Sequence, residues 1–327
     1  MYYAPVLIPT LNRFEHLKRL IESLQKNSYA QFTELYISVD YPPAEKYFEG
    51  YEKICKYLKS PIKGFKAVNI LKQEKNLGAF NNIDFLYSLA SEKYDRCIFT
   101  EDDNEFSPNF LEYMDKGLEL IKNNDHCLGL TGFNIPVLWD NSNLNVIPCY
   151  WINYGSGYFF NIQSSLKKKY SYSWFYNKFF SISSLWNLYK TSKLMFNIYL
   201  RGLLCRKDPL MFDNAGNVRF IDTVQTLLMI LDNKYYIAPI LSLSRNWGYD
   251  GSGENMGNDN RFQKYPIDTN TSFDFVLPES FKMTKKNKRI FGKEFMLYDT
   301  KFMDLHILKN LVLFLLKRKQ LKKEFCE

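Results

Sequence analysis

The chain has 327 residues, of which 46% are hydrophobic, so it can bury the core of one large domain or of one domain with an appendage. Its formal net charge is +8, and this whole excess lies between Lys282 and Glu327, where 13 basic residues accompany five acidic ones. The neutral body argues against a nucleic-acid-binding protein, and the presence of only three histidines argues against a histidine-based hydrolase or a zinc site.

In chain order, the first 135 residues alternate short apolar runs with segments of helical periodicity. The apolar runs predict strands at 6–8, 35–39, 67–71, 97–100 and 127–131. Helices are predicted between these strands, and Ser107 and Pro108 predict where the helix after the fourth strand begins. Repeated β-α units of this kind predict an α/β fold, in which helices sandwich a mostly parallel sheet.

Polar residues follow three of the predicted strands. Asp40 and Asn76 come after the second and third strands, and three consecutive acids, Glu101, Asp102 and Asp103, come after the fourth. Ligands of such sheets bind beyond the carboxyl ends of the strands, so one crevice could hold all five side chains. Adjacent carboxylates repel unless a cation is present, which favours a hard divalent ion that bridges to nucleotide phosphates; a solvated turn is the alternative. The chain has no Gly-x-Gly-x-x-Gly or Walker-type loop, which argues against a dinucleotide fold or an NTPase.

Several of these segments together resemble the nucleotide-binding half of GT-A glycosyltransferases. They are residues 4–13, 38–40, 100–103 and 108–113. The order and spacing are most similar to the N-acetylglucosaminyltransferase I type (family 13), and family 2 transferases share the opening segment. Residues 246–253 look like a segment of related bacterial sugar transferases. The resemblance covers residues 4–135 well and residues 215–258 loosely.

The resemblance implies a role for each acid of the triplet. Asp103 would be the direct protein ligand of Mn²⁺ or Mg²⁺, which would clamp the donor diphosphate. Asp102 would reach the ribose hydroxyls, and Glu101 would lie on the donor-sugar side. A metal at this position stabilises the negative charge that a leaving nucleoside diphosphate gains in the transition state.

The resemblance also assigns residues around the triplet to the nucleotide sugar. Asp40 would pair with the uracil edge, and Arg13 would lie near the base or the phosphates. An ordinary strand-end cap is the alternative for Asp40, and a surface helix start is the alternative for Arg13. Pro9, Thr10 and Asn76 complete the predicted nucleotide-sugar site.

An inverting transferase needs a base that takes the proton of the acceptor hydroxyl. In the resembling family this base is an aspartate that precedes a helix, a strand and a Ser-Arg pair. Asp222 holds the corresponding position before an apolar helix at 224–231. A helix N-cap is an equally good interpretation of Asp222. The rival candidates are Asp208, Asp213 and Asp250.

Two further regions allow a functional and a structural interpretation. The Gly-rich stretch 248–260 predicts either a lid over the donor diphosphate or a flexible connector. The middle of the chain is rich in aromatic residues, which could stack on acceptor sugars or pack in the core. These aromatic residues are Trp139, Tyr150, Trp151, Tyr154, Tyr158, Trp174, Tyr176 and Trp186.

The C-terminal tail combines the excess positive charge with a predicted helix at 302–316. Its apolar stripe is followed by basic residues at 317–319 and 322–323. The apolar run is too short to span a bilayer, so the pattern favours a helix that lies on an anionic membrane surface. A helix docked on the domain is the alternative.

The sequence therefore predicts a GT-A fold with a donor half at 1–135, an acceptor half at 136–262 and a basic extension at 263–327. The predicted enzyme is a metal-dependent, inverting glycosyltransferase that moves a sugar from a UDP-sugar to a hydroxyl of a glycan or lipid-linked glycan acceptor, in surface polysaccharide synthesis. Six scattered cysteines and the absence of a signal peptide predict a cytoplasmic protein, peripheral on the inner face of the membrane. The alternatives are a sugar-phosphate nucleotidyltransferase and a non-catalytic, membrane-associated sugar-binding protein.

Overall fold

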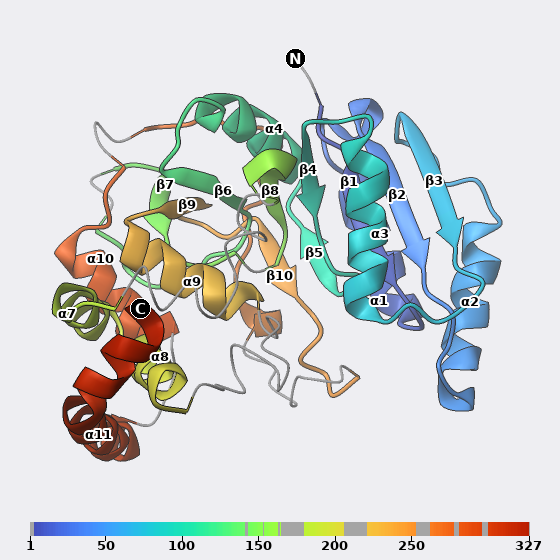
Figure 1. Cartoon of the computed structure of the whole chain (residues 1–327). Coiled ribbons are helices and arrows are strands. Elements are labelled where there is room, and N and C mark those ends of the chain that lie inside the picture. Colours follow the sequence, from blue (N-terminus) through green and yellow to red (C-terminus); the bar gives the residue numbers. More distant parts are fainter. Residues whose placement is uncertain are drawn as a thin grey trace.

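The protein is built around one mixed sheet of eight strands with helices on both faces (Figure 1). This confirms the predicted α/β class. The sheet order is β3-β2-β1-β4-β8-β6-β9-β7. The computed structural model describes residues 3–140, 143–152, 154–162, 164, 180–205, 221–252, 262–277, 281–295 and 300–326.

The N-terminal half of the sheet is parallel. Its strands are β1 (Val6–Thr10), β2 (Glu34–Val39), β3 (Ala67–Lys72) and β4 (Arg96–Phe99). β1 lies between β2 and β4, and β3 is the edge strand beside β2. Since all four strands run the same way, their carboxyl ends meet at one edge of the sheet. The four strands predicted in this half are confirmed.

The C-terminal half of the sheet is mixed. β8 (Ser156–Phe159) is antiparallel to both β4 and β6 (Cys127–Thr131), whereas β9 (Tyr235–Pro239) is parallel to β6. β7 (Val146–Cys149) closes the edge, antiparallel to β9. The insertion of β8 joins the two halves into a continuous sheet.

A small two-stranded ribbon lies next to the acid triplet. β5 (Asn104–Phe106) begins directly after Asp103 and pairs antiparallel with β10 (Ser244–Asn246). Figure 1 shows β5 and β10 side by side near the middle of the molecule. The ribbon therefore brings the chain at 246–252 to the carboxyl end of β4.

The helices of the N-terminal half follow the predicted periodicity. They are α1 (Phe14–Gln25), α2 (Phe48–Leu58), α3 (Ala79–Ser91) and α4 (Phe110–Ile121), with short 3₁₀ turns at Ala30–Phe32 and Glu45–Tyr47. The predicted start of α4 is wrong by two residues. Ser107 is not the cap, because its carbonyl accepts from Phe110 N in a tight turn and its hydroxyl donates to Asn109, the residue at the N-cap position of α4.

The helices of the C-terminal half gather on one side of the sheet. They are α7 (Ile182–Thr191), α8 (Lys193–Cys205), α9 (Ile221–Asp232), α10 (Lys285–Ile290) and α11 (Thr300–Cys326), with a 3₁₀ turn at Phe262–Lys264 and a π-helical turn at Phe291–Phe295. α11 is longer than the predicted 302–316 segment. No helix in the described part of the chain is long and apolar enough to cross a bilayer.

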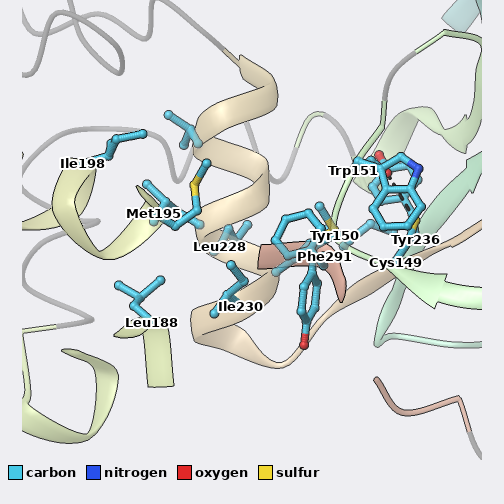
Figure 2. Packing of buried hydrophobic residues seen from close by; sticks show 14 of the residues in the cluster. Cys149, Tyr150, Trp151, Leu188, Met195, Ile198, Leu228, Ile230, Tyr236 and Phe291 are labelled. Atoms are coloured by element: carbon cyan, nitrogen blue, oxygen red, sulfur yellow. Dashed lines mark hydrogen bonds between the residues drawn. The ribbon is translucent and has the colours of Figure 1, made fainter. Parts of the chain in front are cut away.

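Many of the aromatic residues in the middle of the chain belong to the core. Trp151 stacks on Trp139 and on Phe291, with ring centroids 5.6 and 5.9 Å away. Figure 2 shows Trp151 and Phe291 in this cluster. Four of these aromatic residues are buried, which supports packing in the core over stacking on acceptor sugars: Trp139, Tyr150, Trp151 and Tyr158. Trp186 is instead exposed, and Trp174 and Tyr176 lie outside the described residues.

Candidate active site

The acid triplet lies where β4 ends, beside the end of β1. Asp102 and Asp103 are buried, with 3% and 6% of their surface exposed, whereas Glu101 is exposed. Thr10, the last residue of β1, donates its hydroxyl proton to Asp102 Oδ2 at 2.7 Å. The parallel register of β1 and β4 produces this contact between residues 92 positions apart and brings Thr10 to the triplet. The predicted contact of Thr10 with a nucleotide sugar stays a prediction. Pro9 precedes it within β1.

Arg13 neutralises part of the charge of the triplet. It occupies the N-cap position of α1, and its guanidinium bridges the two buried acids, with a hydrogen bond to Asp102 and one of 2.8 Å from Nη1 to Asp103 Oδ2. Burial disfavours the charge of Arg13, but Asp102, Asp103 and Glu101 outweigh this effect and raise its pKa. Arg13 is therefore a permanent cation within the site.

The β5–β10 ribbon wraps the chain around Asp103. Asn246 Nδ2 donates to Asp103 Oδ1 at 2.8 Å, and Trp247 N donates to the Asp103 carbonyl at 2.8 Å. The backbone of Gly248 then passes so close that a β-carbon there would lie 2.2 Å from Asp103 Oδ2. Any larger residue would force the carboxylate or the ribbon to shift, so glycine suits this close approach.

Glu101 is the accessible acid of the triplet. The surrounding protein removes water from the carboxyl group, and this desolvation together with the nearby charge of Asp103 raises the pKa of Glu101 to about 7, although Arg13 opposes the shift. Asp222 also raises the pKa of Glu101, so the two carboxyl groups lie within electrostatic range. The structure thus brings Asp222, from the start of α9, to the same region as the triplet.

Asp222 lies inside the first turn of α9 and not before it. Its side chain is exposed, and its Oδ1 accepts from Thr223 N at 2.8 Å. The surrounding protein raises the pKa of Asp222 despite this backbone hydrogen bond. A carboxylate with a raised pKa is a better proton acceptor, which suits a general base. The hydrogen bond from Thr223 N also satisfies an N–H group at the start of the helix, which suits a helix cap. The geometry is therefore compatible with both roles.

Asp40 and Asn76 contact each other beyond the ends of the neighbouring strands β2 and β3. Asp40 accepts hydrogen bonds from Leu77 N at 2.8 Å, from Gly78 N at 2.9 Å and from Asn76 Nδ2 at 3.3 Å. These bonds fix the turn before α3, in which Gly78 has a positive φ of 75°. Contact between Asp40 and a nucleobase stays a prediction, and it would require the base to share an acceptor that already holds this turn.

The start of the Gly-rich stretch is tied to two other parts of the site. Tyr249 hydrogen-bonds through its hydroxyl to Tyr154 at 2.7 Å, and the charges of Asp103 and Glu101 add to burial in raising the pKa of Tyr154. Asp250 Oδ2 lies 3.0 Å from His16 Nε2 on α1. The rest of the predicted lid, residues 253–260, lies outside the described residues.

The rival bases are not equivalent to Asp222. Against the effect of burial, hydrogen bonds with Ser252 and the proximity of His16 lower the pKa of Asp250, which makes it a weaker base. Asp208 and Asp213 lie outside the described residues.

The carboxylate oxygens of the triplet fit the coordination of a divalent cation in part. Three carboxylates surround the single guanidinium of Arg13, which leaves negative charge to be balanced, and all their donor atoms are hard oxygens. Within the described residues, however, no three side chains of the His, Cys, Asp or Glu type converge as a complete metal site. An ion at Asp103 would therefore need oxygens from a bound ligand to complete its coordination.

Sequence reasoning missed the ribbon residues of this site. Asn246 and Gly248 contact Asp103 across more than 140 positions, and Tyr154 reaches the site from the loop before β8. The Asn246–Gly253 segment stands out as a motif, but nothing local in it indicates Asp103 as its partner.

Comparisons with known proteins complete the assignment. No curated protein matches the chain at a significant level. Among solved structures, S. aureus TarS is 13% identical with a TM-score of 0.35, over 50% of this chain and 29% of TarS. S. aureus TarS 1-349 in complex with UDP is 13% identical with a TM-score of 0.35, over 52% of this chain and 50% of that one. The mannosyltransferase PcManGT from Pyrobaculum calidifontis, in complex with GDP-Man and Mn²⁺, is 10% identical with a TM-score of 0.37, over 50% of this chain and 46% of that one.

The chain thus covers half or less of the length of the chains in these three structures. The sequence model of glycosyl transferase family 2 matches residues 6–189, which is more than half of the chain and includes the triplet, Arg13 and the parallel half of the sheet. The protein therefore belongs to glycosyl transferase family 2.

Proposed function

We propose that the protein is a metal-dependent, inverting glycosyltransferase that uses a UDP-sugar as donor. The observation that carries the proposal is the cluster at the end of β4, where Thr10 and Arg13 contact Asp102 and Asp103 in a chain of family 2. A surplus of carboxylate oxygens beside one long cationic side chain suits a site that must hold both a divalent ion and a diphosphate.

In this proposal Asp103 is the direct ligand of Mn²⁺ or Mg²⁺. When bound, the ion would stabilise the negative charge that develops on the leaving nucleoside diphosphate. Asn246 holds one Asp103 oxygen, and Gly248 keeps the backbone clear of the other. Arg13 would leave both Asp103 and Asp102 and pair with the phosphates, which would free an Asp102 oxygen for the ribose.

Asp222 is the proposed general base. Its carboxylate is exposed, lies within electrostatic range of Glu101 and has a raised pKa, as a proton acceptor in such a site requires. The proton of the acceptor hydroxyl would pass to Asp222 as the hydroxyl oxygen attacks the anomeric carbon. The bond from that carbon to the diphosphate oxygen would break on the opposite face, and the nucleoside diphosphate would leave. Single displacement of this kind inverts the configuration of the transferred sugar.

The acceptor is proposed to be a glycan or a lipid-linked glycan in surface polysaccharide synthesis, at the cytoplasmic face of a membrane. This proposal rests on the basic helix α11 and not on the catalytic residues. The donor half at 1–135, the acceptor half at 136–262 and the extension at 263–327 remain the proposed division of the chain. The closer resemblance to the N-acetylglucosaminyltransferase I type also stays a prediction.

A donor screen tests the proposal directly. Purified protein is incubated with UDP-, GDP- and dTDP-sugars, with Mn²⁺, Mg²⁺ or EDTA, and both thermal stabilisation and release of the nucleoside diphosphate are measured. We expect metal-dependent stabilisation and slow hydrolysis with a UDP-sugar. Stabilisation by a sugar 1-phosphate together with a nucleoside triphosphate would instead support the nucleotidyltransferase alternative, and binding without turnover would support the non-catalytic one.

A further inference from the structure

The C-terminal helix α11 has two separate apolar faces. One face packs on the protein through Ile307, Phe314 and Leu321, which recur every seven residues and are all buried. Phe314 contacts Phe180 with ring centroids 5.8 Å apart, and Asn310 donates to Asn197 of α8 at 2.8 Å. This face accounts for the docking of α11 beside α8 (Figure 1).

The other face of α11 is apolar and exposed. Its residues are Leu305, Leu308, Val312, Leu315 and Leu316, with exposed fractions between 49% and 78%. At about 100° per residue, these side chains centre on the side of the helix opposite Ile307, Phe314 and Leu321. Docking on α8 therefore leaves these five side chains, which we call the stripe, exposed to solvent, although their burial would be favourable.

Positive charge continues the same stripe toward the end of the helix. Lys319 and Lys323 lie seven and eleven residues after Val312, and this spacing places all three on one side of the helix. Three more basic residues lie on the same last turns, namely Lys317, Arg318 and Lys322. All five basic side chains are exposed. The exposed face of α11 is thus mainly apolar over its first part and strongly cationic over its last part.

We propose that this exposed face of α11 binds the surface of an anionic phospholipid bilayer, with the helix axis in the membrane plane. Leucine and valine side chains would enter the headgroup boundary, and the terminal lysines would pair with lipid phosphates. A second copy of the chain fits less well, because Lys319 and Lys323 continue the stripe where a helix pair would need apolar residues. The inference does not depend on the proposed catalytic site.

Helix α7, which packs on α8 as α11 does, carries side chains of the type found at lipid interfaces. Ile182, Trp186 and Tyr189 are exposed at helical spacing, and Lys190 Nζ lies 4.7 Å from the centre of the Trp186 ring. Tryptophan and tyrosine concentrate at the membrane–water boundary because their rings are amphipathic. Figure 1 shows α7 and α11 on the same side of the molecule, so both helices can lie near one surface.

Vesicle co-sedimentation of the full-length protein tests the proposal. Vesicles contain phosphatidylcholine alone or an equal mixture with phosphatidylglycerol. We expect binding to the mixed vesicles at low salt. The double variant Leu308→Glu/Leu315→Glu should bind at least about tenfold more weakly, because it places charge on the inserted face. Leu120→Glu, at an exposed leucine of α4, is the matched control and should bind like the parent protein.

The contribution of charge is tested separately. Lys319→Gln/Lys323→Gln should weaken binding to the mixed vesicles by roughly 30-fold at low salt, and by less as salt screens the attraction. All four substituted side chains are exposed, so the melting temperature should stay close to that of the parent protein.

Three results would overturn the proposal. They are equal binding to both kinds of vesicle, unchanged binding of the leucine variant, and a lipid-free dimer in sedimentation equilibrium that the leucine variant dissociates. The last result would identify a second copy of the chain as the occupant of the stripe.

Discussion

Arg13 Nη1 donates to Asp103 Oδ2 at 2.8 Å, at the oxygen that a metal ion would need. The other Asp103 oxygen already accepts from Asn246. A metal ion and the Arg13 ion pair therefore compete for the same lone pairs. In the proposed donor complex the diphosphate would supply further oxygen ligands to the metal ion and a new anionic partner to the Arg13 guanidinium. Arg13 would then release the Asp103 oxygen to the ion.

Replacing Arg13 by methionine should make the protein depend on a metal ion for its stability. The variant leaves Asp102, Asp103 and Glu101 without their cation, and breaking such a largely buried pair costs roughly 2–4 kcal/mol. Added Mn²⁺ should raise the melting temperature of Arg13→Met more than that of the parent protein. Thermal unfolding with Mn²⁺ and with EDTA measures the difference.

Arg13→Lys is the control, because it keeps the charge and loses the bridging geometry. It should be less destabilised than Arg13→Met and should respond less to Mn²⁺. If Mn²⁺ affects Arg13→Met no more than it affects the parent protein, the cluster does not bind the ion.

Asp103→Asn should remove metal-dependent donor binding and leave the fold intact. The substitution changes charge and hardly changes volume, and asparagine can still accept the hydrogen bond from Asn246. Loss of the ligand should weaken Mn²⁺-dependent binding of a UDP-sugar by about 100-fold or more. Isothermal titration with and without Mn²⁺ measures this effect, with Glu49→Gln on the exposed face of α2 as control. Unchanged metal dependence would show that another residue is the ligand.

Gly248→Ala tests the close packing of the ribbon backbone on Asp103 without altering any charge. A β-carbon at this position would lie 2.2 Å from Asp103 Oδ2, so either the carboxylate or the ribbon must shift. We expect weaker metal-dependent donor binding, by about tenfold or more, since small displacements of a ligating group are costly. Gly251→Ala is the matched control, because its β-carbon would meet nothing within 4 Å and only its positive φ of 83° causes strain. Equal effects of the two variants would contradict a specific role of Gly248.

The parts of the structure that local patterns determine could be predicted from the sequence. The parallel strands are continuous apolar runs, and the acids at their carboxyl ends follow from chain order alone. α11 extends beyond the predicted end at residue 316, because the basic residues that follow are good helix formers.

The parts that long-range contacts determine could not be predicted. β8 is only four residues long and lies between β4 and β6. There the carbonyl oxygen of Gly157 in β8 comes close to Gly129 in β6. A β-carbon on residue 129 would lie only 2.4 Å from this oxygen, so the pairing depends on a glycine at that position. Asn246 and Asp103 lie 143 positions apart, so no local pattern indicates their hydrogen bond. The two faces of α11 likewise become distinct only because α8 covers one of them.

Asp115 should make stability depend on pH. It is 1% exposed, its Oδ1 accepts from Ala4 N at 2.8 Å, and no described residue donates to its Oδ2. Burial raises the pKa of Asp115 from 3.8 to about 7, although the bond from Ala4 opposes the shift. The folded state therefore holds a proton that the unfolded state has lost, and its contribution to stability falls as pH rises from about 4 to 7, by about 1.4 kcal/mol per pH unit.

Asp115→Asn should remove this loss, because the amide is neutral at every pH and its oxygen can still accept from Ala4 N. The free energy of unfolding of the variant, relative to the parent protein, should rise between about pH 4 and pH 7 and stay constant above that. Urea unfolding across this range measures it, and Asp125→Asn at an exposed site is the control. A difference that does not vary with pH would contradict a raised pKa at Asp115.

Asp222→Asn should lower the transfer rate far more than donor affinity. Asparagine keeps the acceptor for Thr223 N at the start of α9, so the helix should remain stable, but it cannot take a proton from the acceptor hydroxyl. Loss of a general base lowers the rate by about 10²–10⁴-fold. The kcat for transfer should fall by this factor, while the dissociation constant of the UDP-sugar and the melting temperature stay close to those of the parent protein. Near-normal turnover with a lower melting temperature would show that Asp222 serves α9 alone. The exposed Asp125→Asn variant again provides the control, because it removes the same charge outside the candidate site.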